Sequence, residues 1–489
     1  MEERPRITYF SITSRFKKQH NQHAGFHLRT CPVLQDHFCR PKINTLNCMS
    51  NLSQVETVVT EEGLLRAIGT RSLSLGIINM IIGAGIFVLP GLVASLLGPS
   101  AILAYLICSV AVALVFLCFA EAGSRVSRSG GAYAYIEDAF GPFAGFLAAT
   151  LLWFGWGALA NAAVAIALAE MLAVAFPVFS GALPKALFII VLFGGLAWIN
   201  IIGVKSGVRF AAVNTYGKLI PLAILVLFGA FFVQWDYLAI TAMPSVSNLG
   251  AGTLLLVFAF GGAEIALNAG GEIKNPERTV PLGLLIGIGV VFILYLSIQT
   301  VAQGVLGPDL AISLEAPLVA TAERAFGPWG KTFLLIGAGI SLVGVTSGHI
   351  LSNPRALFAA ARDGLLPRKL AEVHPRYKTP AMAILFYSVL ACGFALSGSF
   401  KTLAIVSSGS VLLLYLGTSL AVLKLRKNGQ TSTKKVFVLP FGPAIPLLSS
   451  AVVIWLLSNM KLEEAIGLGL LLLVSSLLYV VQRYFRKVN

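Results

Sequence analysis

Two glycine-rich interruptions inside long apolar segments are the residues of this sequence best suited to bind a ligand. The first is the stretch IGAGIF at 82–87, followed by Pro90-Gly91, and the second is FAFGGAE at 258–264. Glycine weakens a helix, so each stretch predicts a break that frees backbone N–H and C=O groups. Close packing between helices is the alternative explanation for such small residues.

The freed peptide groups define the chemistry of such a break. N–H groups at the start of a half-helix carry partial positive charge and can bind a carboxylate, while carbonyls at a half-helix end can bind an ammonium group. A zwitterion satisfies both ends at once. The pattern therefore favours an α-amino acid over a sugar, which would need many polar side chains, and over a polyamine, which lacks the carboxylate.

The elements around these breaks must cross a membrane. The chain has 489 residues, of which 57% are hydrophobic and only 12% are charged, and its mean hydropathy is +0.83. Continuous apolar runs of about 20 residues, each long enough to span hydrocarbon, recur along the chain. This composition excludes soluble, secreted, collagenous and disordered proteins, and the uninterrupted runs argue against a β-barrel.

We expect an all-α polytopic membrane protein with about twelve spans. The second break lies five spans after the first, so the two interrupted helices run in opposite directions, as an inverted repeat of helices 1–5 and 6–10 requires. The expected spans are residues 74–96, 101–122, 143–173, 185–203, 212–233, 252–271, 281–306, 331–352, 381–398, 402–424, 440–458 and 464–482.

Basic residues predict the orientation. The net charge of +15 does not indicate nucleic acid, because the 36 Lys and Arg residues lie between the apolar runs. Sorting them by loop places about 30 on the side of the N-terminus, so the positive-inside rule predicts that both termini are cytoplasmic.

The chain divides into three expected regions. Residues 1–65 form a polar, basic tail, expected to be disordered; residues 66–435 form the ten-helix core; and residues 436–489 add helices 11 and 12 with a basic end. Several Cys and His residues lie close together in the tail, but their spacing matches no zinc-finger pattern, so no metal is expected.

We hypothesise that the segment before Met49 is an upstream extension without function, because an ordinary cytoplasmic lead into a helix begins at Met49. Mass spectrometry of the natively expressed N-terminus tests this. We expect no peptides from residues 1–48, and their detection would contradict the hypothesis.

Two charged residues lie within apolar spans. A charged lysine near the bilayer centre costs roughly 2.5–3.5 kcal/mol of insertion free energy. Lys218 therefore either snorkels to the cytoplasmic surface or is kept for a function. Glu264 follows the second break, where it could carry a proton or brace the unwound segment through hydrogen bonds. The sequence leaves these alternatives open.

Three motifs resemble the amino acid/polyamine/organocation permease family. Helix 1 resembles its G-x-G-[IV]-F signature; FAFGGAEIALNAGGEIKNPERTVP at 258–281 resembles its helix 6 and following loop; and NPRALFAAARDGLLP at 353–367 resembles its helix 8–9 loop. The resemblance covers residues 66 to about 485. It implies a LeuT-like fold, with a five-plus-five inverted repeat, discontinuous helices 1 and 6, and two extra helices.

The resemblance also implies roles for individual residues. The substrate carboxylate would bind the amides of Gly83, Ala84, Gly85 and Ile86, with the amine near carbonyls of Ile81, Phe258 and Gly261. Phe258 or Phe260 would be the gate, Ala259 and Gly261 would shape the side-chain pocket, and Asn161 resembles a substrate-contacting position. Lys218 would replace a sodium ion, making transport sodium-independent.

These features predict a secondary active amino acid transporter of the plasma (cell inner) membrane, working by alternating access with proton coupling or exchange. Neutral substrates are favoured because only Glu264 is acidic in the pocket segments. A cationic amino acid or polyamine carrier is the alternative, and a substrate sensor is less favoured. No motif indicates an enzyme, a nucleotide-driven pump or a cofactor. The oligomeric state is not predicted.

Overall fold

The computed structural model describes residues 66, 68–126, 128–202, 207–362, 366–377, 379–427 and 436–488. The expected disordered tail, with Met49, lies outside the described residues, as does the basic segment 428–435. Expectations about those parts of the chain stay predictions.

The described secondary structure is helical, apart from a single isolated bridge between Ile68 and Ile273. The α-helices are α2 (Thr70–Ile81), α3 (Ala84–Leu97), α4 (Ala101–Arg125), α5 (Ala132–Phe140), α6 (Pro142–Thr150), α7 (Leu159–Ala175), α8 (Ala182–Ile202), α9 (Gly207–Gly229), α10 (Val246–Phe260), α11 (Ala263–Ala266), α12 (Pro276–Leu306), α13 (Pro317–Phe326), α14 (Pro328–Arg362), α15 (Ala381–Ser397), α16 (Phe400–Lys427), α17 (Ala444–Leu457) and α18 (Leu462–Val488).

Short 3₁₀ turns and one π-helix lie between these α-helices. The 3₁₀ turns are η1 (Gly98–Ser100), η3 (Pro177–Ser180), η4 (Ala230–Phe232), η5 (Trp235–Leu238), η6 (Leu267–Glu272), η7 (Gly307–Ala311) and η8 (Arg368–Ala371). The element η2 (Leu151–Ala158) is a π-helix and runs directly into α7.

Eight helices in the described part of the chain are long and apolar enough to cross a membrane. Three shorter apolar helices cover Tyr216–Phe232, Ala381–Ser397 and Ala444–Leu457. An all-helical integral membrane protein is therefore confirmed. The expected number of twelve spans and the inverted repeat stay predictions.

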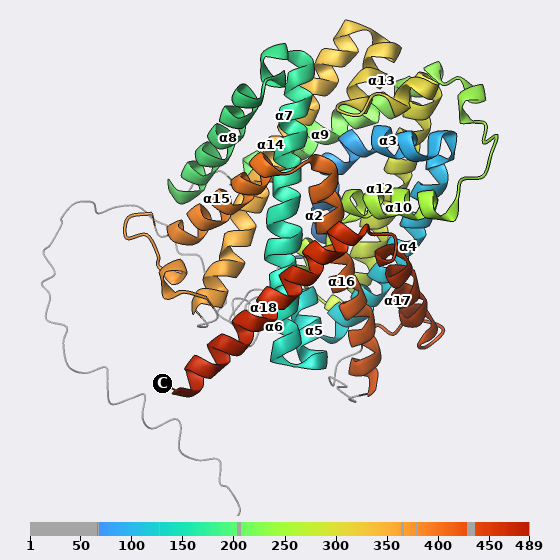
Figure 1. Ribbon diagram of the computed structural model, residues 1–489. Coiled ribbons are helices and arrows are strands. Elements are labelled where there is room, and N and C mark those ends of the chain that lie inside the picture. Colours follow the sequence, from blue (N-terminus) through green and yellow to red (C-terminus); the bar gives the residue numbers. More distant parts are fainter. Residues whose placement is uncertain are drawn as a thin grey trace, which may run out of the picture. The chain divides into compact units, whose positions relative to one another are not determined.

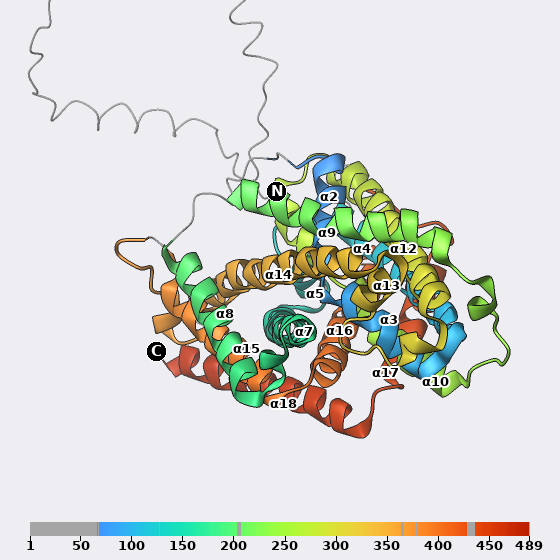
Figure 2. The same cartoon turned by 90° about the horizontal axis from the view of Figure 1, so that it is seen from above.

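Helix α7 occupies the middle of the bundle. Figure 2, which views α7 nearly end-on, places α14 on one side of it and α16 on another, with α8 and α15 beyond. In the span Pro142–Ala175, which contains α7, 72% of the most apolar stretch is buried, against 11% for the span Leu462–Arg483 in α18 (Figure 1). The alanine-rich sequence of α7 explains its central place, because small side chains let neighbouring helices approach closely.

Local signals fix where several helices begin. Pro142, Pro276 and Pro317 occupy the first turn of α6, α12 and α13, where the missing N–H of proline costs no helical hydrogen bond. Helix α10 begins after Ser245, whose hydroxyl accepts a hydrogen bond from the backbone N–H of Asn248 at 3.2 Å.

A buried carboxylate joins the end of α4 to the end of α16. Glu121 is fully buried and forms ion pairs with Arg125, at 2.8 Å, and with Arg426. It also accepts a hydrogen bond from the backbone N–H of Leu439 at 2.9 Å. Because a buried carboxylate without partners is costly, these bonds fix the two helix ends and the segment before α17 relative to one another.

The chain segment that leads into α2 is tied to the segment that follows α11. The N–H of Ile68 donates to the carbonyl of Glu272, and the N–H of Lys274 donates to the carbonyl of Ile68, both at 2.9 Å. This two-bond bridge brings together the ends of the two helices in which the sequence predicts a break.

Candidate functional site

The first predicted interruption separates α2 from α3. Helix α2 ends at Ile81 and α3 begins at Ala84, with Ile82 and Gly83 outside both helices. No side chain caps the start of α3. The first N–H groups of a helix have no partner within it, so α3 presents donors with partial positive charge at a buried position.

Lys218 of α9 caps the other side of this break. Its side chain is fully buried, and its Nζ donates to the carbonyl of Asn79 at 2.6 Å and to that of Ile82 at 2.9 Å. These carbonyls lie at the end of α2, where an ammonium group is favourable because the helix dipole is negative there. The alternative that Lys218 snorkels to the membrane surface is therefore wrong.

The second predicted interruption separates α10 from α11. Helix α10 ends at Phe260, and the backbone passes through Gly261 and Gly262 before α11 begins at Ala263. Gly262 has φ of 129°, which a residue with a side chain rarely adopts, and a Cβ added there would lie 2.6 Å from the carbonyl oxygen of Met80. This break therefore lies against the end of α2.

Glu264 holds the second break in shape. Its carboxylate is fully buried and accepts hydrogen bonds from the backbone N–H of Gly262, at 2.9 and 3.1 Å, and from the hydroxyl of Tyr415, at 2.9 Å. Both oxygens are engaged, one of them by two donors. The geometry supports the bracing role that the sequence left as one of two alternatives.

The two breaks touch each other. A Cβ added to Gly85 would lie 2.5 Å from the Cα of Ala259, so the start of α3 packs directly on the end of α10. Ile81, Ala84, Ile86, Ala259 and Phe260 are all at most 2% exposed. The fold thus brings together the backbone segments that the sequence selected as a binding site, although they lie more than 170 residues apart.

Tyr295 of α12 joins the breaks, and sequence reasoning missed it. Its hydroxyl lies 3.1 Å from the carbonyl oxygen of Ile81 and 3.1 Å from that of Ala259. A hydroxyl has a single proton, so it donates to one carbonyl at a time. The only available signal was a tyrosine in the middle of an apolar span, which is equally typical of ordinary packing.

Aromatic rings surround the second break on two sides. Phe258 packs edge-on against Trp156 of η2 and Phe400 of α16, with ring centroids 5.9 and 5.6 Å apart. Phe260 packs against Tyr295, at 5.0 Å. Both phenylalanines predicted as gate candidates are buried beside the break.

Asn161 of α7 is fully buried, and neither polar atom of its side chain has a hydrogen-bond partner among the described residues. Leaving a buried amide unsatisfied is costly, and most buried polar groups have partners. Such an amide is a candidate for contact with a polar ligand, and its role in substrate binding stays a prediction.

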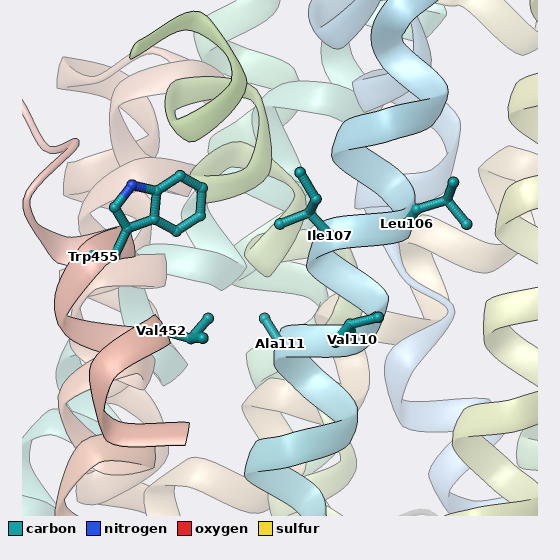
Figure 3. A pocket seen from close by; sticks show the side chains of 6 residues that line it. All are labelled: Leu106, Ile107, Val110, Ala111, Val452 and Trp455. Atoms are coloured by element: carbon teal, nitrogen blue, oxygen red, sulfur yellow. The ribbon is translucent and has the colours of Figure 1, made fainter. Parts of the chain in front are cut away.

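A cavity of about 290 Å³ lies away from the breaks, between α4 and α17 (Figure 3). Its lining is apolar and comprises Leu106, Ile107, Val110, Ala111, Val452 and Trp455. The side chain of Val110 is 62% exposed, so this groove opens on the outer surface of the bundle. None of these lining residues is charged, so the groove does not suit a zwitterion.

Comparison with known proteins agrees with these observations. The family model described as amino acid permease matches residues 68–481. The serine/threonine exchanger SteT of Bacillus subtilis (strain 168) is 32% identical over 421 residues, covering 85% of this chain and 95% of the relative. The same organism's methylthioribose transporter is 28% identical and its branched-chain amino acid permease BcaP 27% identical, each covering 87% of this chain and 95% or 94% of the relative.

The contact of Tyr295 with the breaks predicts a stability difference between two tyrosine variants. Tyr295→Phe leaves a buried carbonyl without its donor, which costs about 1–3 kcal/mol and lowers the midpoint of thermal unfolding in detergent. Tyr105→Phe is the control, because the Tyr105 hydroxyl is buried without a hydrogen-bond partner among the described residues. Equal midpoints for the two variants would contradict the assigned hydrogen bonds.

Proposed function

The chain belongs to the amino acid permease family, and we propose that it works by alternating access around the paired helix breaks. Its family makes it an amino acid transporter and not an enzyme. The observation that carries this proposal is the direct contact between the start of α3 and the end of α10, at Gly85 and Ala259. Substrate binds where these two segments meet and is released to either side as the surrounding helices move.

Backbone groups bind the common part of the substrate. The amides of Gly83, Ala84, Gly85 and Ile86 receive the carboxylate at the positive end of α3. Carbonyls of Ile81, Phe258 and Gly261 receive the amine; the Ile81 carbonyl also contacts Tyr295, and a carbonyl oxygen has a second lone pair for this purpose. Phe258 or Phe260 closes the site.

The architecture that fits this mechanism is a LeuT-like inverted repeat of five plus five helices, followed by two more. Its support is the five-span offset that the sequence predicts between the two breaks and the contact of the breaks in the bundle. The distribution of basic residues supports cytoplasmic termini. A plasma (cell inner) membrane location is part of the same proposal.

Neutral amino acids are the proposed substrates. Among the described residues the buried acidic side chains are Glu121 and Glu264, and both are already bonded within the protein. A cationic amino acid or a polyamine would therefore lack a free carboxylate beside the breaks. Two of the relatives are named for serine, threonine and branched-chain amino acids, which fits this preference.

Lys218 is proposed to make transport independent of sodium. Its ammonium group bonds the carbonyls of Asn79 and Ile82 and supplies the positive charge that a bound cation would otherwise bring to this helix end. We assign proton coupling to the same lysine. Glu264 has the separate role of bracing the second break.

Uptake by purified protein in liposomes tests the proposed function. We expect labelled serine, threonine or leucine to accumulate when vesicles contain an unlabelled neutral amino acid or experience a proton gradient, and to do so without sodium. Arginine, putrescine and methylthioribose serve as comparison substrates. A protein that binds an amino acid but never moves it would instead be a sensor.

Lys218→Met tests the coupling role. We expect sodium-independent uptake to fall by about tenfold or more, because the carbonyls at the end of α2 lose a charged donor worth about 1.5–3 kcal/mol. Lys185→Met is the matched control, since Lys185 lies at the start of α8 in a partly exposed ion pair with Glu170. Vesicles with Lys218→Met that keep both sodium independence and the pH response would rule out this role.

A further inference from the structure

A π-helix interrupts the regular hydrogen bonding of the central span. In η2 (Leu151–Ala158) the backbone bonds run to the fifth residue along, so the pattern of the α-helix is lost for one or two turns. The carbonyl of Gly157, near the end of η2, accepts a hydrogen bond from the hydroxyl of Tyr387 in α15 at 2.9 Å. A side chain from a different helix thus fixes the π-helical segment.

Two residues of α14 complete this contact. The Nδ2 of Asn353 donates to the hydroxyl oxygen of Tyr387 at 2.9 Å and lies 3.2 Å from Nδ1 of His349. The amide of Asn353 also covers Gly157, because a Cβ added to Gly157 would lie 2.9 Å from the Asn353 Cγ. Tyr387 is fully buried, so water does not compete for these bonds.

The residue before Gly157 faces the second break. Trp156 is 4% exposed and packs edge-on against Phe258, with ring centroids 5.9 Å apart. A Cβ added to Gly261 would lie 2.5 Å from Cη2 of the indole, so Trp156 occupies the space beside this glycine. The proposed pocket for the substrate side chain, at Ala259 and Gly261, is therefore bounded by an indole that belongs to η2.

We propose that Tyr387 and Asn353 are positioning residues that set the size of substrate the transporter accepts, by holding the Gly157 carbonyl and thereby pressing Trp156 against Gly261. This inference rests on the proposed function. It assigns a specificity role to a hydrogen-bond chain that runs from α14 through α15 to η2, where Trp156 contacts the second break.

The hydrogen-bond chain meets the backbone where the π-helix ends. A π turn inserts an extra residue into a helix and rotates the turns after it, so it sets which side chain faces a neighbour. A π turn moves backbone carbonyls away from their usual α-helical partners, and Tyr387 donates to one of them, the carbonyl of Gly157. Without the hydroxyl, the backbone at Gly157 can relax and the indole can move away from Gly261.

The test compares substrates of different size in liposomes. Tyr387→Phe removes only the hydroxyl. We expect the uptake efficiency for leucine, divided by that for serine, to rise by about tenfold. The change should come chiefly from KM, and the maximal rate for leucine should be retained. Trp156→Phe should shift the ratio in the same direction. Combining both substitutions should add little, because they act through one contact.

Ser388→Ala is the matched control, since Ser388 is the next residue of α15 and its buried hydroxyl has no hydrogen-bond partner among the described residues. Asn353→Ala is the second variant and should shift the ratio in the same direction if Tyr387→Phe does not fold. An unchanged ratio, or an equal loss for both substrates, would overturn the proposal. Failure of the unsubstituted protein to move any amino acid would instead overturn the proposed function.

Discussion

The structure depends on satisfying the peptide groups that two broken helices expose in the interior of an apolar bundle. Lipid tails offer no hydrogen bonds, so each free N–H or C=O must find a partner in the protein, in a ligand or in a water-filled cavity. Lys218 bonds the end of α2, Tyr295 lies between the carbonyls of both breaks, and Glu264 accepts the N–H of Gly262. The start of α3 has no side-chain cap, and it is here that we propose the substrate carboxylate binds.

Each partner comes from a different helix, so the breaks are joined to much of the bundle. Lys218 belongs to α9, Tyr295 to α12 and Tyr415, which bonds Glu264, to α16. A movement of α2 or α11 must therefore exchange hydrogen bonds with these helices and cannot occur in isolation. The bridge between Ile68 and Ile273 adds a direct link between the segments that flank the two broken helices. This connectivity is what a carrier needs if substrate binding is to change the arrangement of its helices.

The charged end and the side-chain end of the substrate are proposed to bind different parts of the site. In the proposed mechanism the backbone groups of the breaks bind the ammonium and carboxylate that all α-amino acids share. Trp156 lies against Gly261 and belongs to the π-helix whose Gly157 carbonyl Tyr387 bonds, so the proposed side-chain pocket is tied to that helix. On these proposals, a change in the packing around η2 would alter the substrate size without disturbing the backbone groups. That separation is consistent with relatives named for serine and threonine and for branched-chain amino acids.

The sequence by itself determined that the protein is helical and spans a membrane, because apolar length and composition alone decide this. It also located both breaks, since glycine acts on the backbone wherever the helix is placed: the gaps at Ile82–Gly83 and Gly261–Gly262 lie within the predicted stretches. It selected Lys218, because a lysine in an apolar span needs an explanation, but it left open whether that lysine turns outward or inward.

Only the tertiary structure decided the partners. Tyr295, Trp156 and Tyr387 lie in spans that are apolar on all sides, so no periodic pattern reveals which face of each helix turns toward the breaks. The π-helix at Leu151–Ala158 rotates the side chains that follow it relative to the neighbouring helices, and no distinctive sequence marks it. Which side chains meet depends on the rotation and contact of helices far apart in the chain, and linear spacing does not encode it.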